Sequence, residues 1–549
     1  MGICRAQCRR GEFYHDATLP GKSLSLGRGG PPTALGQFMR PVNHHQRLGH
    51  PYAPGCAARE RAQGRLTSIN AKDRDPWWDG DIKSRTNERS GGKTIGNWPM
   101  SAAAIERDLI TRYATPLPRY TSYPTANHFS SAVDAKVYGD WLAQLPATPS
   151  LSLYLHIPYC RELCWYCGCS TKAVRRYEPV TEYLRLLCRE VSTVGERLPE
   201  RHQVTHLHWG GGSPDILSPE DIVRLGRGLQ KTFHLATGAE HAVEVDPRLL
   251  NTARAAAFAE VGINRVSIGV QDFDEAVQKA IGRIQGFDVT RQAVRLFRER
   301  GIHSINIDLV YGLPHQTTAS VLRTVDKVLG LEPDRIAVFG YAHLPSRLKH
   351  QRLIDKAALP NAAARHEQST RIAERLVAAG YVQVGLDHFA QPSDPLATAA
   401  LHRNFQGYTT DEAPVLIGLG ASSIGALPQG YAANEIAIDR YKETVREGRL
   451  PVTRGIAVTG EDRLRRAIIE RLMCDMSVDL EEIALMHDVE AESFDADLSR
   501  LAPLEADGIV IRSGRRLELT DEGRPLVRAV CAVFDEYLGK GAARHSKAV

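Results

Sequence analysis

The chain has 549 residues, of which 43% are hydrophobic and 24% are charged, a globular composition with room for two or three domains. No apolar run approaches the roughly 20 residues that a membrane helix needs, so the sequence argues against an integral membrane protein and against a fibrous or wholly disordered chain. The net charge of +5 arises from residues 1–99, which carry +8, whereas the rest carries −3 and gives no support to a nucleic-acid-binding core.

Residues 1–99 are rich in Gly, Pro, Arg and His and have no helical or strand periodicity. Gly29–Pro32 is a cluster of structure breakers. The composition predicts a disordered or non-native extension. An Arg-rich targeting peptide is the alternative, although Glu12 and Asp16 speak against it. Because no secretory signal is visible, we expect a cytoplasmic protein.

Residues 150–395 alternate between short apolar runs and amphipathic helical patterns. The predicted strands are Leu151–Ile157, Val204–Trp209, Ala242–Val245, Arg265–Val270, Ser304–Val310 and Arg335–Phe339. The predicted helices are Val180–Val194, Asp221–Phe233, Arg254–Val261, Val289–Arg298 and Ser320–Leu329. Six strands in alternation with such helices, one repeat roughly every 30–40 residues, predict an α/β fold with a parallel sheet that forms a partial (βα)6, TIM-like barrel, whose chemistry lies at the carboxyl ends of the strands.

Residues 458–549 follow a different pattern and predict a smaller, mainly helical, winged-helix-like C-terminal domain. The predicted elements are helices Glu461–Cys474, Leu480–Met486 and Phe494–Leu504, a hairpin over Gly508–Thr520 and a last helix, Glu522–Tyr537. Because this region has no concentrated basic face, a packing or lid role is favoured over DNA binding.

Four of the ten cysteines lie within ten residues, directly after the first predicted strand. Cys160, Cys164 and Cys167 have the spacing that holds three irons of a [4Fe–4S] cluster and leaves the fourth iron open. The amino and carboxylate groups of S-adenosylmethionine suit that open iron. Zinc is the alternative, but structural zinc sites usually take their ligands from two separated pairs. Cys169 is left without a ligand role.

This cysteine loop on a strand–helix repeat resembles the radical S-adenosylmethionine (SAM) superfamily. Over about residues 104–540 the sequence further resembles the oxygen-independent coproporphyrinogen III oxidases. The matching segments are Pro118–Thr125, His156–Cys169, Gly269–Phe273, Tyr341–Pro345 and His402–Tyr408. The resemblance implies an arm (100–149) over the active site, the radical SAM barrel (150–395) and a connecting segment (396–457) that carries the His402–Tyr408 motif.

Polar residues at the ends of the predicted strands are candidates for binding the cofactor. A structural salt bridge is the alternative for each carboxylate, and a plain turn for the glycine-rich segment. The resemblance implies that Gly211, Gly212 and Ser213 meet the methionine amino group. It also assigns SAM contacts to Glu244, Gln271, Arg283 and Asp308, and places Tyr154 and Tyr166 beside the cluster loop. It implies a second SAM molecule, with Ala342 and Ile424 among its contacts.

The resemblance implies that a 5′-deoxyadenosyl radical takes hydrogen from the β-carbon of a propionate side chain, which then loses CO2 and an electron and becomes a vinyl group. Two such reactions convert coproporphyrinogen III to protoporphyrinogen IX. Arg119 and Arg403 are candidate propionate clamps, with ordinary salt bridges as the alternative. The expected partner is a low-potential donor such as flavodoxin or ferredoxin, and the expected state is a monomer that engages neither nucleic acid nor membrane.

Two other functions remain open at the level of sequence. One is a haem-trafficking or other radical SAM protein. The second, from a different class, is a zinc-stabilised binding protein with a winged-helix tail.

Overall fold

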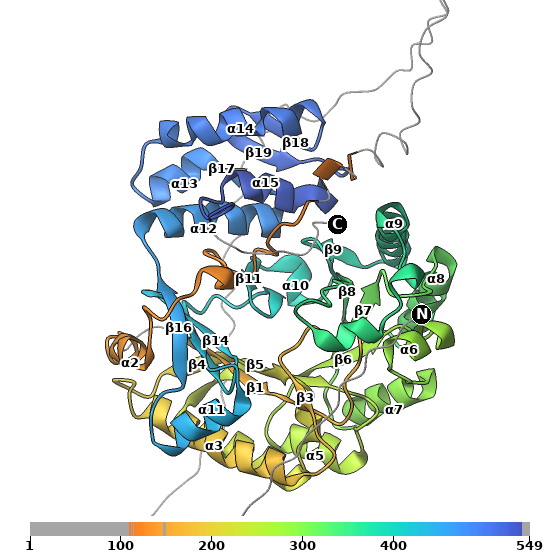
Figure 1. The fold of residues 1–549 in the computed structure, drawn as a ribbon, viewed down its shortest axis with the longest axis vertical. Coiled ribbons are helices and arrows are strands. Elements are labelled where there is room, and N and C mark those ends of the chain that lie inside the picture. The colour runs from red at the N-terminus through yellow and green to blue at the C-terminus, as the bar shows by residue number, and fades with distance from the viewer. Residues whose placement is uncertain (1–108, 111, 114, 147–149, 541–549) are drawn as a thin grey trace, which may run out of the picture. The chain divides into compact units, whose positions relative to one another are not determined.

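A computed structural model describes residues 109–540 except 111, 114 and 147–149. The predicted extension over residues 1–99 therefore lies outside the described residues. Within the described part, the core of the fold is a twelve-stranded sheet with the order β16-β15-β14-β13-β1-β4-β5-β6-β7-β8-β10-β9 (Figure 1).

Six adjacent strands at the centre of this sheet are parallel, and each lies over a predicted strand. They are β1 (Leu151–Ile157), β4 (Gln203–Gly211), β5 (His234–Val245), β6 (Arg265–Gln271), β7 (Ser304–Tyr311) and β8 (Arg335–Gly340). Their central residues are almost fully buried, as expected for parallel strands covered on both faces. The predicted α/β fold with a mostly parallel sheet is confirmed.

Amphipathic helices follow these strands and lie along the outside of the sheet, with α3, α5 and α7 along its lower side in Figure 1. They are α3 (Glu178–Gly195), α4 (Pro219–Thr232), α5 (Thr252–Glu260), α6 (Glu275–Ile281), α7 (Phe287–Arg298), α8 (Thr318–Leu329) and α9 (Ala362–Ala378). Local sequence sets their starts: Ser218 caps α4 through Asp221 N, and Thr317 forms a capping box with Ser320 on α8. The seven-residue α6 is too short to have been visible as a periodic pattern.

The sequence predicts residues 396–457 as a connecting segment. In the structure this segment instead adds strands to the central sheet. β13 (Val415–Leu419) pairs in parallel with β1, and three antiparallel strands continue beyond it. These are β14 (Ile424–Leu427), β15 (Gly430–Asn434) and β16 (Val452–Ala457), with α11 (Ile438–Arg446) before the last. The pairing joins residues about 260 positions apart, so no local pattern in the sequence could have indicated it.

Short elements complete this part of the chain. They are α2 (Ala135–Ala143), β2 (Tyr159–Cys160), β3 (Lys172–Ala173), β9 (Val382–Val384), β10 (His388–Ala390), α10 (Pro395–Thr398), β11 (His402–Asn404) and β12 (Gly407–Thr409). β2 and β3 bracket the cysteine loop, and β11 and β12 form a hairpin that carries the His402–Tyr408 motif.

The C-terminal region follows the predicted order of helices and hairpin. Its elements are α12 (Gly460–Asp475), β17 (Ser477–Asp479), α13 (Leu480–Met486), α14 (Asp495–Ala506), β18 (Val510–Ser513), β19 (Arg516–Leu519) and α15 (Val527–Val533). The last helix is shorter than predicted. Pro525 disfavours helical backbone in the residue before it, and the Asp535 carboxylate accepts a hydrogen bond from Tyr537 N in a turn beyond the helix.

A second hydrophobic core joins the N-terminal arm to the C-terminal elements. Ile110, Leu117, Tyr120 and Tyr123 of the arm pack with the buried residues of α12–α15. The Tyr120 hydroxyl also donates to the Asp535 carboxylate at 3.1 Å. The arm is therefore held by the C-terminal elements, which fixes the backbone on either side of Arg119.

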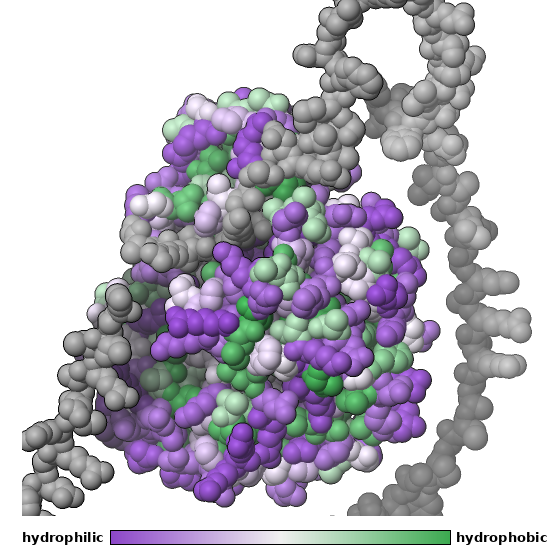
Figure 2. All heavy atoms as spheres, turned by 45° about the vertical axis from the view of Figure 1, so that its right-hand side comes forward, coloured by the Kyte–Doolittle hydropathy of each residue, from purple (hydrophilic) through white to green (hydrophobic). Residues whose placement is uncertain are grey.

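Among the described residues, no helix is long and apolar enough to span a bilayer. Figure 2 shows one face of the molecule, on which hydrophilic residues cover most of the surface and hydrophobic residues gather only in small groups.

Candidate active site

The carboxyl ends of the parallel strands border a cavity of about 850 Å3. Cys167 and Tyr166 of the cysteine loop line this cavity, as do Glu244, Gln271 and Asp308 from the ends of β5, β6 and β7. The sheet thus gathers onto one cavity residues that are more than 140 positions apart, as expected for a barrel whose chemistry lies at its carboxyl edge.

The cysteine loop leaves β1 and runs between the short strands β2 and β3. Its thiols make no disulfide, and they face different partners. Cys160 Sγ lies 3.2 Å from Thr171 Oγ1, and Cys167 Sγ accepts from Cys169 N at 3.4 Å. A hydrogen bond from the Cys169 thiol lowers the pKa of Cys167 to about 7, whereas burial raises the pKa of Cys160 to about 12.

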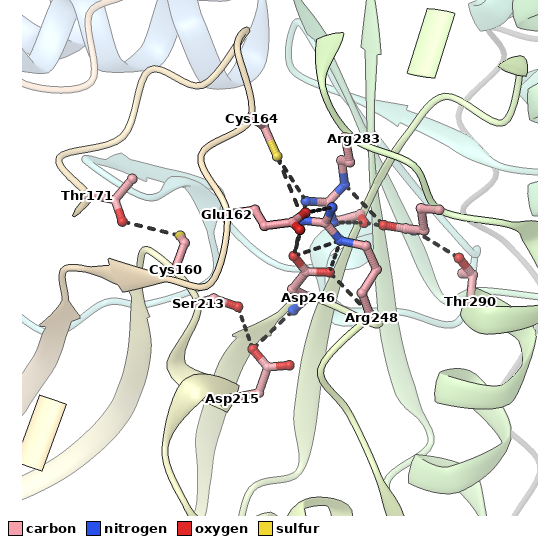
Figure 3. A network of polar contacts seen from close by, with 12 residues as sticks. Cys160, Glu162, Cys164, Thr171, Ser213, Asp215, Asp246, Arg248, Arg283 and Thr290 are labelled. Carbon is pink, nitrogen blue, oxygen red and sulfur yellow. Dashed lines mark hydrogen bonds and ion pairs between the residues drawn. The ribbon is translucent and has the colours of Figure 1, made fainter. Parts of the chain in front are cut away.

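Two guanidinium groups lie against Cys164, as Figure 3 shows. Arg283 Nη1 is 3.5 Å and Arg248 Nη2 is 3.9 Å from Cys164 Sγ. Asp246 joins the two arginines, at 2.6 Å from Arg248 and 3.3 Å from Arg283. Burial alone lowers the pKa of Arg283, but its interactions with Tyr166, Asp246 and Cys164 outweigh this effect and raise that pKa. Arg283 therefore keeps its positive charge beside the Cys164 sulfur.

Glu244 is held by donors from the neighbouring strand β4. Its carboxylate accepts from His208 Nε2 at 3.0 Å and from Gly211 N at 3.1 Å. Burial alone raises the pKa of Glu244, but these hydrogen bonds and the His208 charge outweigh it, so the pKa is lowered. Glu244 is therefore an anion at neutral pH that faces the cavity.

Asp308 lies two strands further along the sheet. It accepts from the Ser267 hydroxyl and from Asn306 Nδ2, both at 2.8 Å. Burial raises its pKa to about 6, and the charge of Glu244 adds to the effect. Gln271, at the end of β6, has a φ of +71°, which ends the strand with its side chain at the cavity.

The glycine-rich turn after β4 allows backbone to approach the cysteine strand closely. A Cβ on Gly212 would lie 2.5 Å from Tyr159 O, and Gly211 has a φ of +111° with the His156 ring against it. Larger residues do not fit at either position, so the close packing of this turn requires glycine at both, and the contact of these glycines with SAM stays a prediction.

Several candidates for SAM binding lie away from the lining of the cavity. The Ser213 hydroxyl donates to Asp215 at 2.5 Å (Figure 3), and the Tyr154 hydroxyl lies 3.1 Å from His156 Nδ1. Ile424 packs against a small apolar cluster instead, whereas Ala342 does line the cavity. The roles of these residues remain predictions.

A second, larger cavity of about 1080 Å3 adjoins the first. Arg119, Phe339, His388 and Phe405 line both cavities, whereas Arg403 lines only the larger. Arg403 Nη2 donates to Arg119 O at 3.3 Å, and its guanidinium lies 4.3 Å from the centre of the Tyr408 ring. The two candidate propionate clamps are therefore neighbours, and each borders open space.

Sequence reasoning missed three residues that shape the site: His208, Asp246 and Arg248. Asp246 and Arg248 follow Glu244 directly after β5, so the rule that selected Glu244 also indicates them. His208 is two residues before the glycine-rich turn, but a lone histidine on a strand gives no signal of its partner across the sheet.

Comparison with known proteins defines the class to which this site belongs. The model of the radical SAM superfamily matches residues 154–328, and the model of the HemN C-terminal domain matches residues 458–526. The first match spans the cysteine loop and strands β4 to β7, so the fold is that of a radical SAM protein.

Curated relatives specify the family within that class. An oxygen-independent coproporphyrinogen III oxidase from Bradyrhizobium diazoefficiens is 51% identical over 450 residues, which are 81% of this chain and 100% of that protein. The enzyme of the same name from Paracoccus denitrificans is 46% identical and covers 79% of this chain and 96% of its own length. The chain belongs to the oxygen-independent coproporphyrinogen III oxidase family.

A solved structure supports the same conclusion. The coproporphyrinogen III oxidase (HemN) from Escherichia coli, described as a radical SAM enzyme, has 39% sequence identity and a TM-score of 0.74. The match covers 76% of this chain and 97% of that chain.

Radical SAM proteins carry a [4Fe–4S] cluster and SAM, and the described residues fit both. Three free thiols share one loop, and two guanidinium groups beside Cys164 suit an anionic thiolate set. Cys160, Cys164 and Cys167 would hold the cluster. The adjoining cavity is lined by an anion, an amide and a protonatable carboxyl group, which suit the polar groups of SAM.

Proposed function

We propose that the protein carries out anaerobic oxidative decarboxylation of two propionate groups of coproporphyrinogen III, giving protoporphyrinogen IX in haem biosynthesis. The observation that carries the proposal is the pair of adjoining cavities: one bordered by the cysteine loop and the strand ends, the other large and bordered by arginines. Family membership supports the same reaction and substrate.

When bound, the cluster and SAM supply a 5′-deoxyadenosyl radical, which takes a hydrogen atom from the propionate β-carbon. The radical would leave as 5′-deoxyadenosine, and the side-chain radical would then release CO2 and pass one electron to an electron acceptor, so that the two remaining carbons form a vinyl group. The chain's own part is to position the reactants. Arg119, at the junction of the cavities, would hold the reacting propionate, and the apolar walls, such as Phe339, keep water from the radical.

The proposal includes a low-potential electron donor, such as a flavodoxin or a ferredoxin, because SAM cleavage consumes one electron. It also includes a cytoplasmic location and a monomeric state, neither of which the reaction itself requires. Size-exclusion chromatography with light scattering measures the oligomeric state directly.

The first test is Cys164→Ala in the full chain, purified and reconstituted without oxygen. We expect less than a tenth of the wild-type cluster iron, no broad absorption near 400 nm, and no 5′-deoxyadenosine or protoporphyrinogen. Cys188→Ala is the matched control, because Cys188 is a free, half-buried thiol on α3, away from the loop. The proposed function fails if Cys164→Ala retains full activity.

The substrate is tested separately with the wild-type protein. Coproporphyrinogen III, SAM and dithionite should yield CO2, 5′-deoxyadenosine and protoporphyrinogen IX. Stoichiometric haem binding without any turnover would instead support a haem-trafficking role. A colourless protein with one zinc per chain would support the binding-protein alternative.

A further inference from the structure

The larger cavity contains more positive charge than the two arginines predicted from the sequence account for. Its lining includes six Lys or Arg residues and three Asp or Glu residues, so the cations outnumber the anions by three. The cations are Arg119, Lys356, Arg365, Arg403, Arg524 and Arg528. One of the acids, Asp387, already pairs with His388 at 2.7 Å.

Arg365, Arg524 and Arg528 line the larger cavity and not the smaller one. Arg365 comes from α9, Arg528 from α15 and Arg524 from the turn before α15. Two segments that are remote in the sequence, α9 and the stretch that leads into α15, therefore bring guanidinium groups to one space, whose lining includes none of the cysteine loop.

Main-chain carbonyls hold two of these guanidinium groups in place. Arg365 Nη1 donates to Tyr341 O at 2.8 Å, and Arg524 Nη1 donates to Gly385 O at 2.7 Å. Carbonyl oxygens orient the groups without neutralising their charge. The smaller cavity differs, because Arg265 and Arg335 there pair with the carboxylates of Glu240 and Asp394.

The positive charges of the arginines around this cavity repel one another. Burial and the charge of Arg119 lower the pKa of Arg528 to about 10, and Arg403 adds to this effect. Burial likewise lowers the pKa of Arg365, and Arg119 lowers it further. A bound polyanion would relieve this repulsion, and guanidinium groups suit carboxylates through paired hydrogen bonds.

We propose that Arg365, Arg524 and Arg528 form a second carboxylate-binding group, which holds the carboxylates of the substrate that are not being oxidised. The inference rests on the proposed function. The reacting carboxylate must lie near Arg119 and the smaller cavity, so the other carboxylates of a four-carboxylate macrocycle extend into the larger one. Its volume of about 1080 Å3 is at the upper end of the range for ligand pockets.

A carboxylate that does not react makes the same contacts in the ground state and in the transition state. Loss of such a contact raises KM and leaves kcat nearly unchanged. For Arg365→Gln and Arg528→Gln, each assayed in the full-length reconstituted enzyme per iron-loaded chain, we expect KM for coproporphyrinogen III to rise at least tenfold and kcat to change less than threefold. Arg365→Lys should have a KM between those of the wild type and Arg365→Gln, because lysine keeps the positive charge but cannot form the paired hydrogen bonds of a guanidinium group.

Arg375→Gln is the matched control, because Arg375 lies on the same helix but points to Asp326 on α8, at 2.8 Å. Its KM should stay within twofold of the wild type. Binding of coproporphyrin III, followed by fluorescence, provides a measure without turnover: both cavity variants should bind it at least tenfold more weakly, whereas the uncharged tetramethyl ester should not distinguish them from the wild type.

The inference is overturned if Arg365→Gln and Arg528→Gln keep the wild-type KM and binding affinity, or if Arg375→Gln loses as much as they do. A wild-type protein that neither binds nor converts coproporphyrinogen III would refute the proposed function itself. Wild-type turnover with unaffected cavity variants would refute only the role of this arginine group.

Discussion

The ionisable side chains around the smaller cavity differ in charge state because their partners differ. Glu244 has two donors and stays ionised, whereas Asp308 accepts from two neutral groups and lies near the charge of Glu244, so its pKa rises to about 6. Two carboxyl groups at equivalent strand ends can therefore play different parts, one as an anion and the other as a group that gains or loses a proton near neutrality.

Asp308→Asn tests this difference through the stability of the cofactor-free protein. The folded protein binds the Asp308 proton up to about pH 6 and the unfolded chain only up to 3.8, so this contribution to stability is complete below pH 3.8 and is lost as the pH rises through 6. The variant lacks this dependence. From pH 4.5 to 7.5 its unfolding free energy should therefore rise relative to wild type by about 2 kcal/mol, most of it below pH 6.

Thermal unfolding of both proteins across that pH range measures the effect. Replacing the carboxyl group by an amide also changes the hydrogen bonds at this position. This change adds a constant to the difference in unfolding free energy between the two proteins. The test is therefore how that difference varies with pH. A difference that stays constant over the range would contradict the assigned pKa.

At the scale of elements, the site depends on how closely the turn after β4 approaches the strand that carries Cys160. Gly212 N donates to Ile157 O at 2.8 Å, and Ser213 N donates to Tyr159 O at 2.9 Å. These bonds join the turn to the start of the cysteine loop, so a displacement of one displaces the other. Gly212 has no room for a side chain at this junction.

Gly212→Ala should therefore impair both the stability of the protein and its reaction with SAM. The added Cβ would lie 2.5 Å from Tyr159 O, and backbone cannot yield as a flexible side chain does. We expect a loss of about 1–3 kcal/mol in unfolding free energy and at least a tenfold slower release of 5′-deoxyadenosine.

Gly228→Ala is the matched control for that substitution. Gly228 lies inside α4, and nothing lies within 4 Å of the Cβ it would gain. Alanine there should raise the stability by about 0.5–1 kcal/mol and leave SAM cleavage unchanged. If the two variants had the same stability and the same rate of SAM cleavage, the close approach of backbone at Gly212 would not be what limits the site.

At the scale of the whole molecule, the residues that the structure describes form two large hydrophobic cores, and each core supports a different cavity. The core of the sheet supports the strand ends around the smaller cavity. The core shared by the arm and the C-terminal elements positions Arg119, Arg524 and Arg528 around the larger cavity. Cofactor chemistry and substrate binding should therefore respond differently to damage in each core.

Leu187→Ala and Leu501→Ala test this separation. Both leucines are fully buried, Leu187 in the core of the sheet and Leu501 in the second core, and each substitution should cost about 2–5 kcal/mol. Leu187→Ala should lower the cluster content, SAM cleavage and turnover together. Leu501→Ala should raise KM for coproporphyrinogen III at least threefold while cluster content and SAM cleavage without substrate stay within twofold.

Iron content, 5′-deoxyadenosine release and porphyrinogen turnover, measured on the same preparations, distinguish the two patterns. Parallel losses in both variants would show that the cores act as one unit.

The sequence alone determined the parallel strands, most of their helices and the cysteine spacing. These features are local: an apolar run, a helical period and three thiols within eight residues are all visible without tertiary contacts. The strand-end rule also brought out Glu244, Gln271 and Asp308, because the fold predicts where strand ends meet.

Only the tertiary structure decided the features that depend on distant segments. β13 completes the sheet beside β1, and Asp246 lies between Arg248 and Arg283. The arginines of α9 and α15 share one cavity although more than 150 residues separate them. Nothing in a local stretch of sequence encodes which remote segment it will meet, because that choice depends on the packing of the two hydrophobic cores.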